Sequence, residues 1–199
     1  LFRRFNNNCW EDERVHFWFN DGRQFLLTTR RRYDVINLDP VDPPVCNQYT
    51  QEFFQLCHDR LKEGGLTVLW VPLFHLSTKH VQVIMRAFLN VFKESTLWYD
   101  GTSVLLIGPR GGPLEIDPNR FLKRAQQQTV QDSLAIIGRP HPMLLLSTYV
   151  TGPEGLSRLA LENVPDNTDD FPYLEYALLL AGPLNTRNFA ANLEMLIPH

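Results

Sequence analysis

Apolar residues in the first half of the chain alternate between short continuous runs and helical stripes. The runs YDVINL (33–38) and LTVLWV (66–71) are nearly continuous, which is typical of strands buried on both faces of a sheet. Between them, Thr50 can cap a helix, TQEFFQLCHDRLK, in which apolar residues recur at helical spacing. Gly64 and Gly65 follow, and glycine is common just past the end of a helix. The pattern therefore predicts a strand, a helix and a second strand.

The flanking segments extend this alternation. RVHFWFN (14–20) is rich in β-branched and aromatic residues and predicts a strand, whereas RQFLLTT (23–29) predicts a short helix. Ser77 can begin a second amphipathic helix. The runs STLWYD (95–100) and SVLLIG (103–108) are separated by a glycine-containing turn, so we expect them to pair antiparallel. Strands that alternate with helices indicate an α/β fold with a doubly wound sheet, closed here by one antiparallel edge.

The composition changes after residue 108. PRGGP (109–113) begins a linker that we place at 109–116, and residues 117–199 show mainly helical patterns. The chain is therefore predicted to consist of an α/β part at 1–108, the linker, and a helical C-terminal region. Within that region, residues 167–170 form a polar cluster, for which helix N-capping is the favoured interpretation and a substrate-facing lid the alternative.

Charge and cysteine content argue against several classes of function. The 199 residues carry a formal net charge of −3, which gives no electrostatic reason to expect nucleic acid or an anionic membrane as partner. Three cysteines without a ligand spacing predict neither a disulfide framework nor a zinc site, and they favour a cytoplasmic location. His75 and His80 have no third ligand nearby in the sequence, so no metal is predicted. No apolar run reaches the roughly 18 residues of a membrane-spanning helix.

Two acids follow the first of the buried runs. Asp39 and Asp42 lie within a loop that Pro40, Pro43 and Pro44 stiffen. In open α/β sheets, ligands bind outside the carboxyl ends of the strands, and Asp39 falls at such an end. Two carboxylates there could hold a cationic amine, and one could accept its proton as the amine attacks an electrophile. The local pattern alone equally allows turn residues that merely end the strand.

Taken together, these segments resemble the spermidine/spermine synthase (polyamine aminopropyltransferase) family. YDVINLDPVDPP, followed by YTQEFFQLCHDRLKEGGLTVLW, is similar to the family's strand, acidic loop, helix and glycine pair. The upstream DGRQFL (21–26) and the later FLNVFKESTLWYDGTSVLLIG agree with it. The tail DNTDDFPYLEY (166–176) resembles a bacterial branch whose members are often fused to transporter-like membrane segments. The resemblance covers about residues 10–108 well and 109–176 more loosely.

The resemblance implies a reaction and a site. The family transfers an aminopropyl group from decarboxylated S-adenosylmethionine, a co-substrate and not a permanently bound cofactor, to a polyamine such as putrescine. Asp39 matches its proton-accepting aspartate, and Asp42 matches the neighbouring acid that helps to hold the amine. Asp21 and Gly22 match the pair that contacts the adenine. The resemblance also implies a Rossmann-like class I S-adenosylmethionine-dependent methyltransferase fold, a cytoplasmic enzyme or cytoplasmic domain, and frequently a homodimer.

One part of that fold has no counterpart in the chain. Its sheet order is 3-2-1-4-5-7-6 and its first strand leads into a glycine-rich loop, yet the segment at 14–20 already corresponds to the third strand and no Gly-x-Gly precedes it. GPRGGP (108–113) opens no helix and is interpreted as part of the linker. We therefore expect the natural protein to extend further at its N-terminus, so that this fragment lacks the ribose and methionine contacts. Pairing of 14–20 with 33–38, or a second copy in the gap, are the alternatives.

Two other functions stay open. The segment DPPV (42–45) is similar to the (Asp/Asn)-Pro-Pro-(Tyr/Phe) motif of amino-methyltransferases, but Val45 replaces the aromatic residue and the motif lies late in the loop. The absent glycine loop also agrees with a non-catalytic binding or regulatory module. Release of methylthioadenosine from decarboxylated S-adenosylmethionine and putrescine would distinguish aminopropyl transfer from both.

Overall fold

Five strands form one sheet in the computed structural model, which describes residues 8–40, 47–74, 76–159, 163–179 and 186–197. The strand order is β1-β2-β4-β3-β5. β1 and β2 are parallel, and the other neighbouring pairs are antiparallel. The strands are β1 (Tyr33–Leu38), β2 (Leu61–Pro72), β3 (Thr96–Tyr99), β4 (Ser103–Pro109) and β5 (Tyr149–Thr151).

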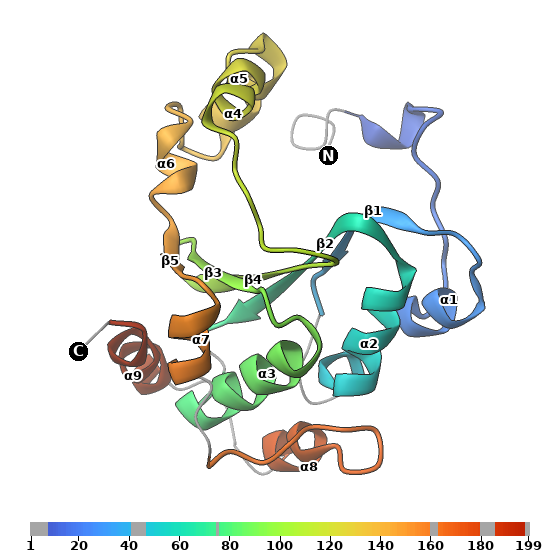
Figure 1. The fold of residues 1–199 in the computed structure, drawn as a ribbon, viewed down its shortest axis with the longest axis vertical. Coiled ribbons are helices and arrows are strands. Elements are labelled where there is room, and N and C mark those ends of the chain that lie inside the picture. The colour runs from blue at the N-terminus through green and yellow to red at the C-terminus, as the bar shows by residue number, and fades with distance from the viewer. Residues whose placement is uncertain (1–7, 41–46, 75, 160–162, 180–185, 198–199) are drawn as a thin grey trace.

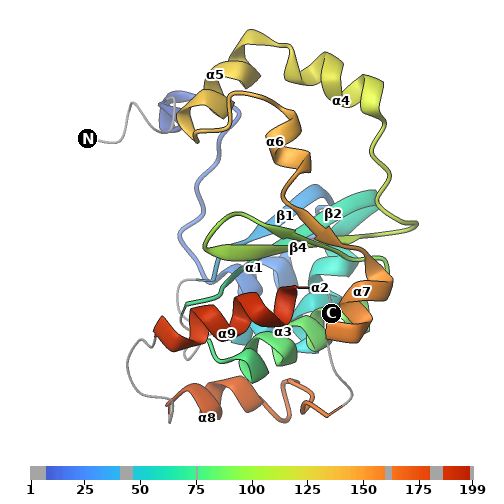
Figure 2. The ribbon, with the colours of Figure 1, turned by 90° about the vertical axis from the view of Figure 1, so that its left-hand side faces the viewer.

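Helices cover the sheet mainly from one side (Figure 1). α1, α2, α3, α7 and α9 lie on that side, and α8 lies beyond α3, as the second view also shows (Figure 2). α4, α5 and α6 lie on the opposite side. The helices are α1 (Gly22–Thr28), α2 (Gln51–Arg60), α3 (Thr78–Val91), α4 (Pro118–Ala125), α5 (Gln128–Ile136), α6 (Met143–Leu146), α7 (Pro153–Leu159), α8 (Tyr173–Leu179) and α9 (Thr186–Leu196), with 3-10 turns η1 (Cys9–Glu11) and η3 (Asn47–Tyr49).

The strand order confirms the predicted α/β topology, but the described part of the sheet is not doubly wound as predicted, because its helices pack mainly on one side (Figure 1). Taken as the fourth to seventh strands of the expected fold, β1, β2, β3 and β4 lie in the order 4-5-7-6. The predicted hairpin is also confirmed, with Tyr99 of β3 opposite Val104 of β4. Thr50 and Ser77 cap α2 and α3 as predicted, because each hydroxyl accepts a hydrogen bond from the backbone N–H three residues further on.

The predicted strand at 14–20 is wrong. Residues 15–19 have no regular secondary structure, and the side chains of Phe17, Trp18 and Phe19 are exposed. A strand forms only where its backbone N–H and C=O groups find partners. Within the described residues, β1 pairs with β2 alone, and 14–20 does not join it. A high β-propensity is therefore not sufficient to form a strand here.

The two glycines after α2 do not end that helix, contrary to the prediction. The helix ends at Arg60, and Gly64 and Gly65 lie within β2, at a point where its register against β1 is shifted. Gly64 has a φ of 73°. A Cβ on Gly65 would lie 2.9 Å from the backbone oxygen of Lys62 and 3.0 Å from that of Tyr33. The glycines therefore permit a bulge in the strand.

The two faces of the sheet differ in burial. Side chains that face the helices are completely buried, such as Leu69 on β2 and Leu106 on β4. Their neighbours on the opposite face, such as Val68 and Leu105, are only half-buried. Val35 on the edge strand β1 is 56% exposed, so this strand is not buried on both faces as predicted. The hydrophobic core thus lies between one face of the sheet and its helices.

The region after residue 116 is mainly helical, as predicted, but it also contributes to the sheet. β5 pairs with β3 in antiparallel orientation, and α7 and α9 contact α3. The division of the chain around 109–116 stays a prediction. None of the helices in the described part of the chain is both long enough and apolar enough to cross a membrane.

Candidate functional site

Asp39 lies at the carboxyl edge of the sheet, directly after β1. Because β1 and β2 are parallel, both strands run toward this edge, with Leu38 opposite Leu69. The Asp39 side chain is exposed and so accessible to a ligand that approaches from solvent. Asp42, its predicted partner, lies outside the described residues, as do all positions from 41 to 46.

Asp21 and Gly22 stand at the start of α1. A carboxylate oxygen of Asp21 accepts a hydrogen bond from the backbone N–H of Gln24 at 2.8 Å and so caps the helix. A Cβ on Gly22 would lie 4.0 Å from Nε2 of Gln48, which shows that the start of α1 lies against the segment leading into α2. The pair is therefore close to the chain that follows residues 41–46. Its contact with an adenine stays a prediction.

Arg23 connects these segments, a role that no local pattern in the sequence indicates. Its Nη1 donates to the backbone oxygen of Asn47 at 2.7 Å and to the hydroxyl of Thr50 at 3.2 Å. The same nitrogen lies 3.0 Å from Oδ1 of Asp169, and Nη2 pairs with the second carboxylate oxygen. The guanidinium carbon lies 5.8 Å from the centre of the Phe53 ring. Arg23 thus joins α1, the entry to α2 and the C-terminal region.

Asp169 belongs to the polar cluster at 167–170. Its Oδ1 also accepts a hydrogen bond from the hydroxyl of Thr50 at 2.7 Å. Partial burial by itself would raise the pKa of the Asp169 carboxyl, but hydrogen bonds from Arg23 and Thr50, together with the charge of Arg23, lower this pKa overall. The contacts therefore favour the ionised carboxylate that the ion pair requires.

Asn167 fixes the same cluster to α2. Its Nδ2 donates to the backbone oxygen of Tyr49 at 2.8 Å, and its backbone oxygen accepts from the N–H of Gln51 at 2.9 Å. Its Oδ1 accepts from the N–H of Leu174 in the first turn of α8, so Asn167 has the predicted capping role. The additional contacts with α2 were not predictable from spacing. The only signal in the sequence is that the cluster at 167–170 contains more polar residues than one helix cap requires.

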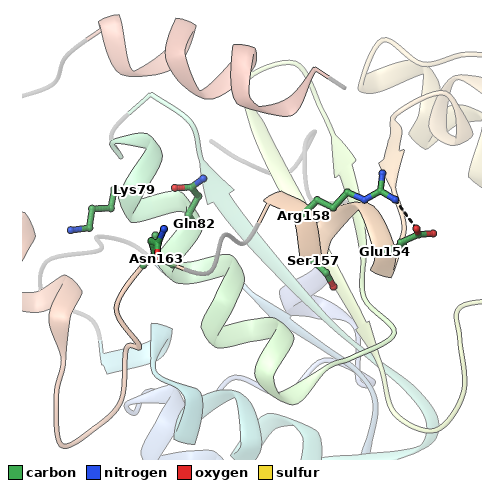
Figure 3. Close-up of a pocket in the computed structure, with 7 residues that line it drawn as sticks. Lys79, Gln82, Glu154, Ser157, Arg158 and Asn163 are labelled. Carbon is green, nitrogen blue, oxygen red and sulfur yellow. Dashed lines mark hydrogen bonds and ion pairs between the residues drawn. The ribbon is translucent and has the colours of Figure 1, made fainter. Parts of the chain in front are cut away.

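A cavity of about 860 Å³ lies elsewhere, between α3, α7 and residues 163–164. Figure 3 shows Lys79 and Gln82 of α3 on one side of it and Arg158 of α7 on the other. Arg158 is paired with Glu154 at 2.6 Å, so its charge is already compensated. The described residues of the candidate site do not line this cavity.

The first half of the chain matches a known family. A model of the spermine/spermidine synthase domain matches residues 1–100. The chain belongs to the spermine/spermidine synthase family. A polyamine aminopropyltransferase of Korarchaeum cryptofilum is 26% identical over 171 residues, which cover 81% of this chain and 52% of that protein. One of Nitrosomonas europaea is 27% identical over 153 residues, or 70% of this chain and 46% of that protein. The chain thus spans about half the length of these curated relatives.

Solved structures share the fold. Spermidine synthase from Thermotoga maritima superposes with a TM-score of 0.61 at 17% sequence identity, covering 80% of this chain and 54% of that one. A spermidine synthase in complex with the transition-state analogue AdoDATO has a TM-score of 0.59 at 16% identity, and the match covers 80% and 53% of the two chains. These likenesses confirm the predicted Rossmann-like, methyltransferase-type α/β fold of this family member.

Proposed function

We propose that this chain carries part of the active site of a polyamine aminopropyltransferase. The co-substrate would be decarboxylated S-adenosylmethionine and the acceptor a polyamine such as putrescine. The observation that carries the proposal is an exposed Asp39 at the carboxyl edge of two parallel strands, in a member of this family. Two relatives named polyamine aminopropyltransferase, and a spermidine synthase bound to AdoDATO, support it.

In the proposed reaction, a neutral nitrogen of the polyamine attacks the aminopropyl carbon that is bonded to the sulfonium sulfur. The carbon–nitrogen bond forms as the carbon–sulfur bond breaks, and the electron pair of the broken bond goes to sulfur, which leaves as methylthioadenosine. The proton of the attacking amine passes to the carboxylate of Asp39. Asp42 would help to hold the cationic polyamine. Such catalysis depends on positioning and on one general base.

Asp21 and Gly22 would contact the adenine. Their position beside Gln48 supports this role, because the nucleoside and amine ends of the substrates would then meet adjacent segments of the chain. A cytoplasmic location, a homodimer, and the division into 1–108 and 117–199 are part of the same proposal and await their own tests.

Release of methylthioadenosine tests the function. We expect the full-length protein to form it from decarboxylated S-adenosylmethionine and putrescine, measured by chromatography. Asp39→Asn should lower kcat about 10²- to 10⁴-fold, which is the usual contribution of a general base. Asp34→Asn is a matched control, because Asp34 is also exposed on β1 but lies near its other end, 2.8 Å from Nζ of Lys62.

The control should keep wild-type turnover. A wild type that forms no methylthioadenosine would sink the proposal. Formation of S-adenosylhomocysteine from S-adenosylmethionine would instead identify a methyltransferase. Binding of putrescine without either product would favour a binding or regulatory module.

A further inference from the structure

We propose that Arg23 and Asp169 are positioning residues of this site, whose ion pair fastens the C-terminal region to the two segments that carry the predicted site residues. The inference rests on the proposed function. It assigns a role to the cluster at 167–170 that neither helix capping nor a substrate-facing lid describes.

Arg23 has neighbours from both halves of the candidate site. It follows Gly22 directly in the first turn of α1, and its guanidinium donates to the backbone oxygen of Asn47, the first described residue after positions 41–46. Asp42 lies in that interval. A displaced guanidinium would therefore disturb the start of α1, which carries the predicted adenine contacts, together with the entry to α2.

Asp169 supplies the opposite charge from 146 residues away in sequence. Its carboxylate accepts from Arg23 and from the Thr50 hydroxyl that caps α2. Its backbone N–H donates to the carboxylate of Glu52 at 2.9 Å, within the first turn of that helix. Two of these contacts fix Asp169 relative to the start of α2, and the third joins it to Arg23 of α1.

Burial of the Arg23 side chain makes it sensitive to loss of Asp169, although the Asp169 side chain itself is 38% exposed. The Arg23 side chain is only 15% exposed and packs over the Phe53 ring. A bidentate pair between a guanidinium and a carboxylate adds geometric specificity as well as attraction. Without Asp169, the guanidinium keeps its charge but loses its counter-ion, so it would turn toward water and release Asn47.

A second ion pair provides a matched control. Nε of Arg86 donates to Asp166 at 2.8 Å and joins the same stretch of chain to α3 instead of α1. The residue types are the same, and Asp166 lies three positions before Asp169. The two pairs differ in which helix they hold, and only the pair with Arg23 lies beside Gly22 and Asn47.

The test compares Arg23→Ala, Asp169→Ala, the double variant, Arg23→Lys and Arg86→Ala in the full-length protein, with methylthioadenosine release as the assay. We expect kcat/KM for putrescine to fall about 10- to 100-fold in each of the two single alanine variants of the pair, since a displacement of about 1 Å can cost this much. The double variant should be no worse than the poorer single variant. Arg23→Lys should recover part of the loss, and Arg86→Ala should keep wild-type kcat/KM.

The melting temperature of each variant separates positioning from stability. We expect Arg23→Ala and Asp169→Ala to show the lower kcat/KM even at temperatures well below their melting temperatures, where each variant is folded. Two outcomes with an active wild type would overturn this inference alone. In the first, the Arg23 and Asp169 variants keep full kcat/KM. In the second, the losses of kcat/KM in the two single variants multiply in the double variant. A wild type without turnover would overturn the proposed function, and with it the inference.

Discussion

The two faces of the sheet show what holds this molecule together and what does not. On β4, Leu106 faces the helices and is completely buried, while its neighbour Leu105 faces the other way and is half-buried. On β1, Ile36 is buried toward the helices, and Val35 on the other face is 56% exposed. The larger part of the hydrophobic stabilisation from the sheet should therefore come from the covered face, because this stabilisation scales with the apolar area removed from water.

The covered face also positions the candidate site. Two of the helices on this face, α1 and α2, are capped by Asp21 and Thr50, and α2 is the first helix after Asp39 along the chain. The half-buried face contributes strand residues but no described site residue. The covered face therefore contributes to both the stability of the protein and the candidate site, whereas the half-buried face contributes little to either.

The largest expected effect is a difference in stability between substitutions at two adjacent residues of β4, one on each face of the sheet. Leu106→Ala should lower the free energy of unfolding by about 2–5 kcal/mol, because it leaves a cavity in a packed core. Leu105→Ala removes the same atoms from a half-buried position and should cost about 1 kcal/mol. Urea unfolding of both variants measures the difference. Equal losses would show that the second face is as well packed as the first.

A smaller effect tests how closely α3 packs on the covered face. A Cβ on Gly108 of β4 would lie 2.7 Å from Cβ and Cδ1 of Phe92, the residue that ends α3. Gly108→Ala should therefore cost about 1–3 kcal/mol through overpacking. Gly112→Ala is the control, because nothing lies within 4 Å of the added Cβ there. A loss of stability at Gly112 that matched the loss at Gly108 would contradict the close contact.

Local signals predicted most of the first half of the fold. The caps of α2 and α3 depend on residues within a few positions of each other, and so does the hairpin of β3 and β4; all were predicted. The segment 14–20 has the composition of a strand, but a strand depends on a partner, which composition does not reveal. Gly64 and Gly65 have two structural uses, a helix end and a strand bulge, that sequence alone does not distinguish.

The residues of the candidate site likewise include some that local sequence signals predicted and some that depend on distant partners. Asp39 was predicted to follow a strand because an apolar run and a proline loop flank it. Arg23 was not selected, because its partners Asn47 and Asp169 lie 24 and 146 residues away and no periodicity connects them. The cluster at 167–170 was interpreted as a helix cap, and the tail around it, 166–176, was matched to a family motif by resemblance. Its contacts with α2 emerge only when the chain is folded.

His80 reports on whether α8 closes the outer surface of α3 on the covered side. His80 of α3 is 8% exposed, and its ring lies 6.4 Å from that of Tyr173 in α8. Burial, together with the charge of Lys79, lowers the pKa of His80 below its usual 6.5. Below pH 6.5 the unfolded chain then binds more protons at this residue than the folded protein does. The free energy of unfolding should therefore fall as the pH drops through 6.5, and this fall should end below the folded pKa.

Each unit of pKa difference corresponds to about 1.4 kcal/mol, so this effect should be smaller than that of Leu106→Ala. His80→Phe keeps an aromatic ring against Tyr173 but cannot be protonated. Its unfolding free energy in urea should lose the part of the pH dependence between pH 5 and 8 that wild type shows. If the unfolding free energies of wild type and variant depend on pH in the same way, the folded protein does not lower the pKa of His80. The protonated His80 side chain then reaches water in the folded protein. In that case α8 does not close the outer side of α3, and the covered side of the molecule is only one helix deep.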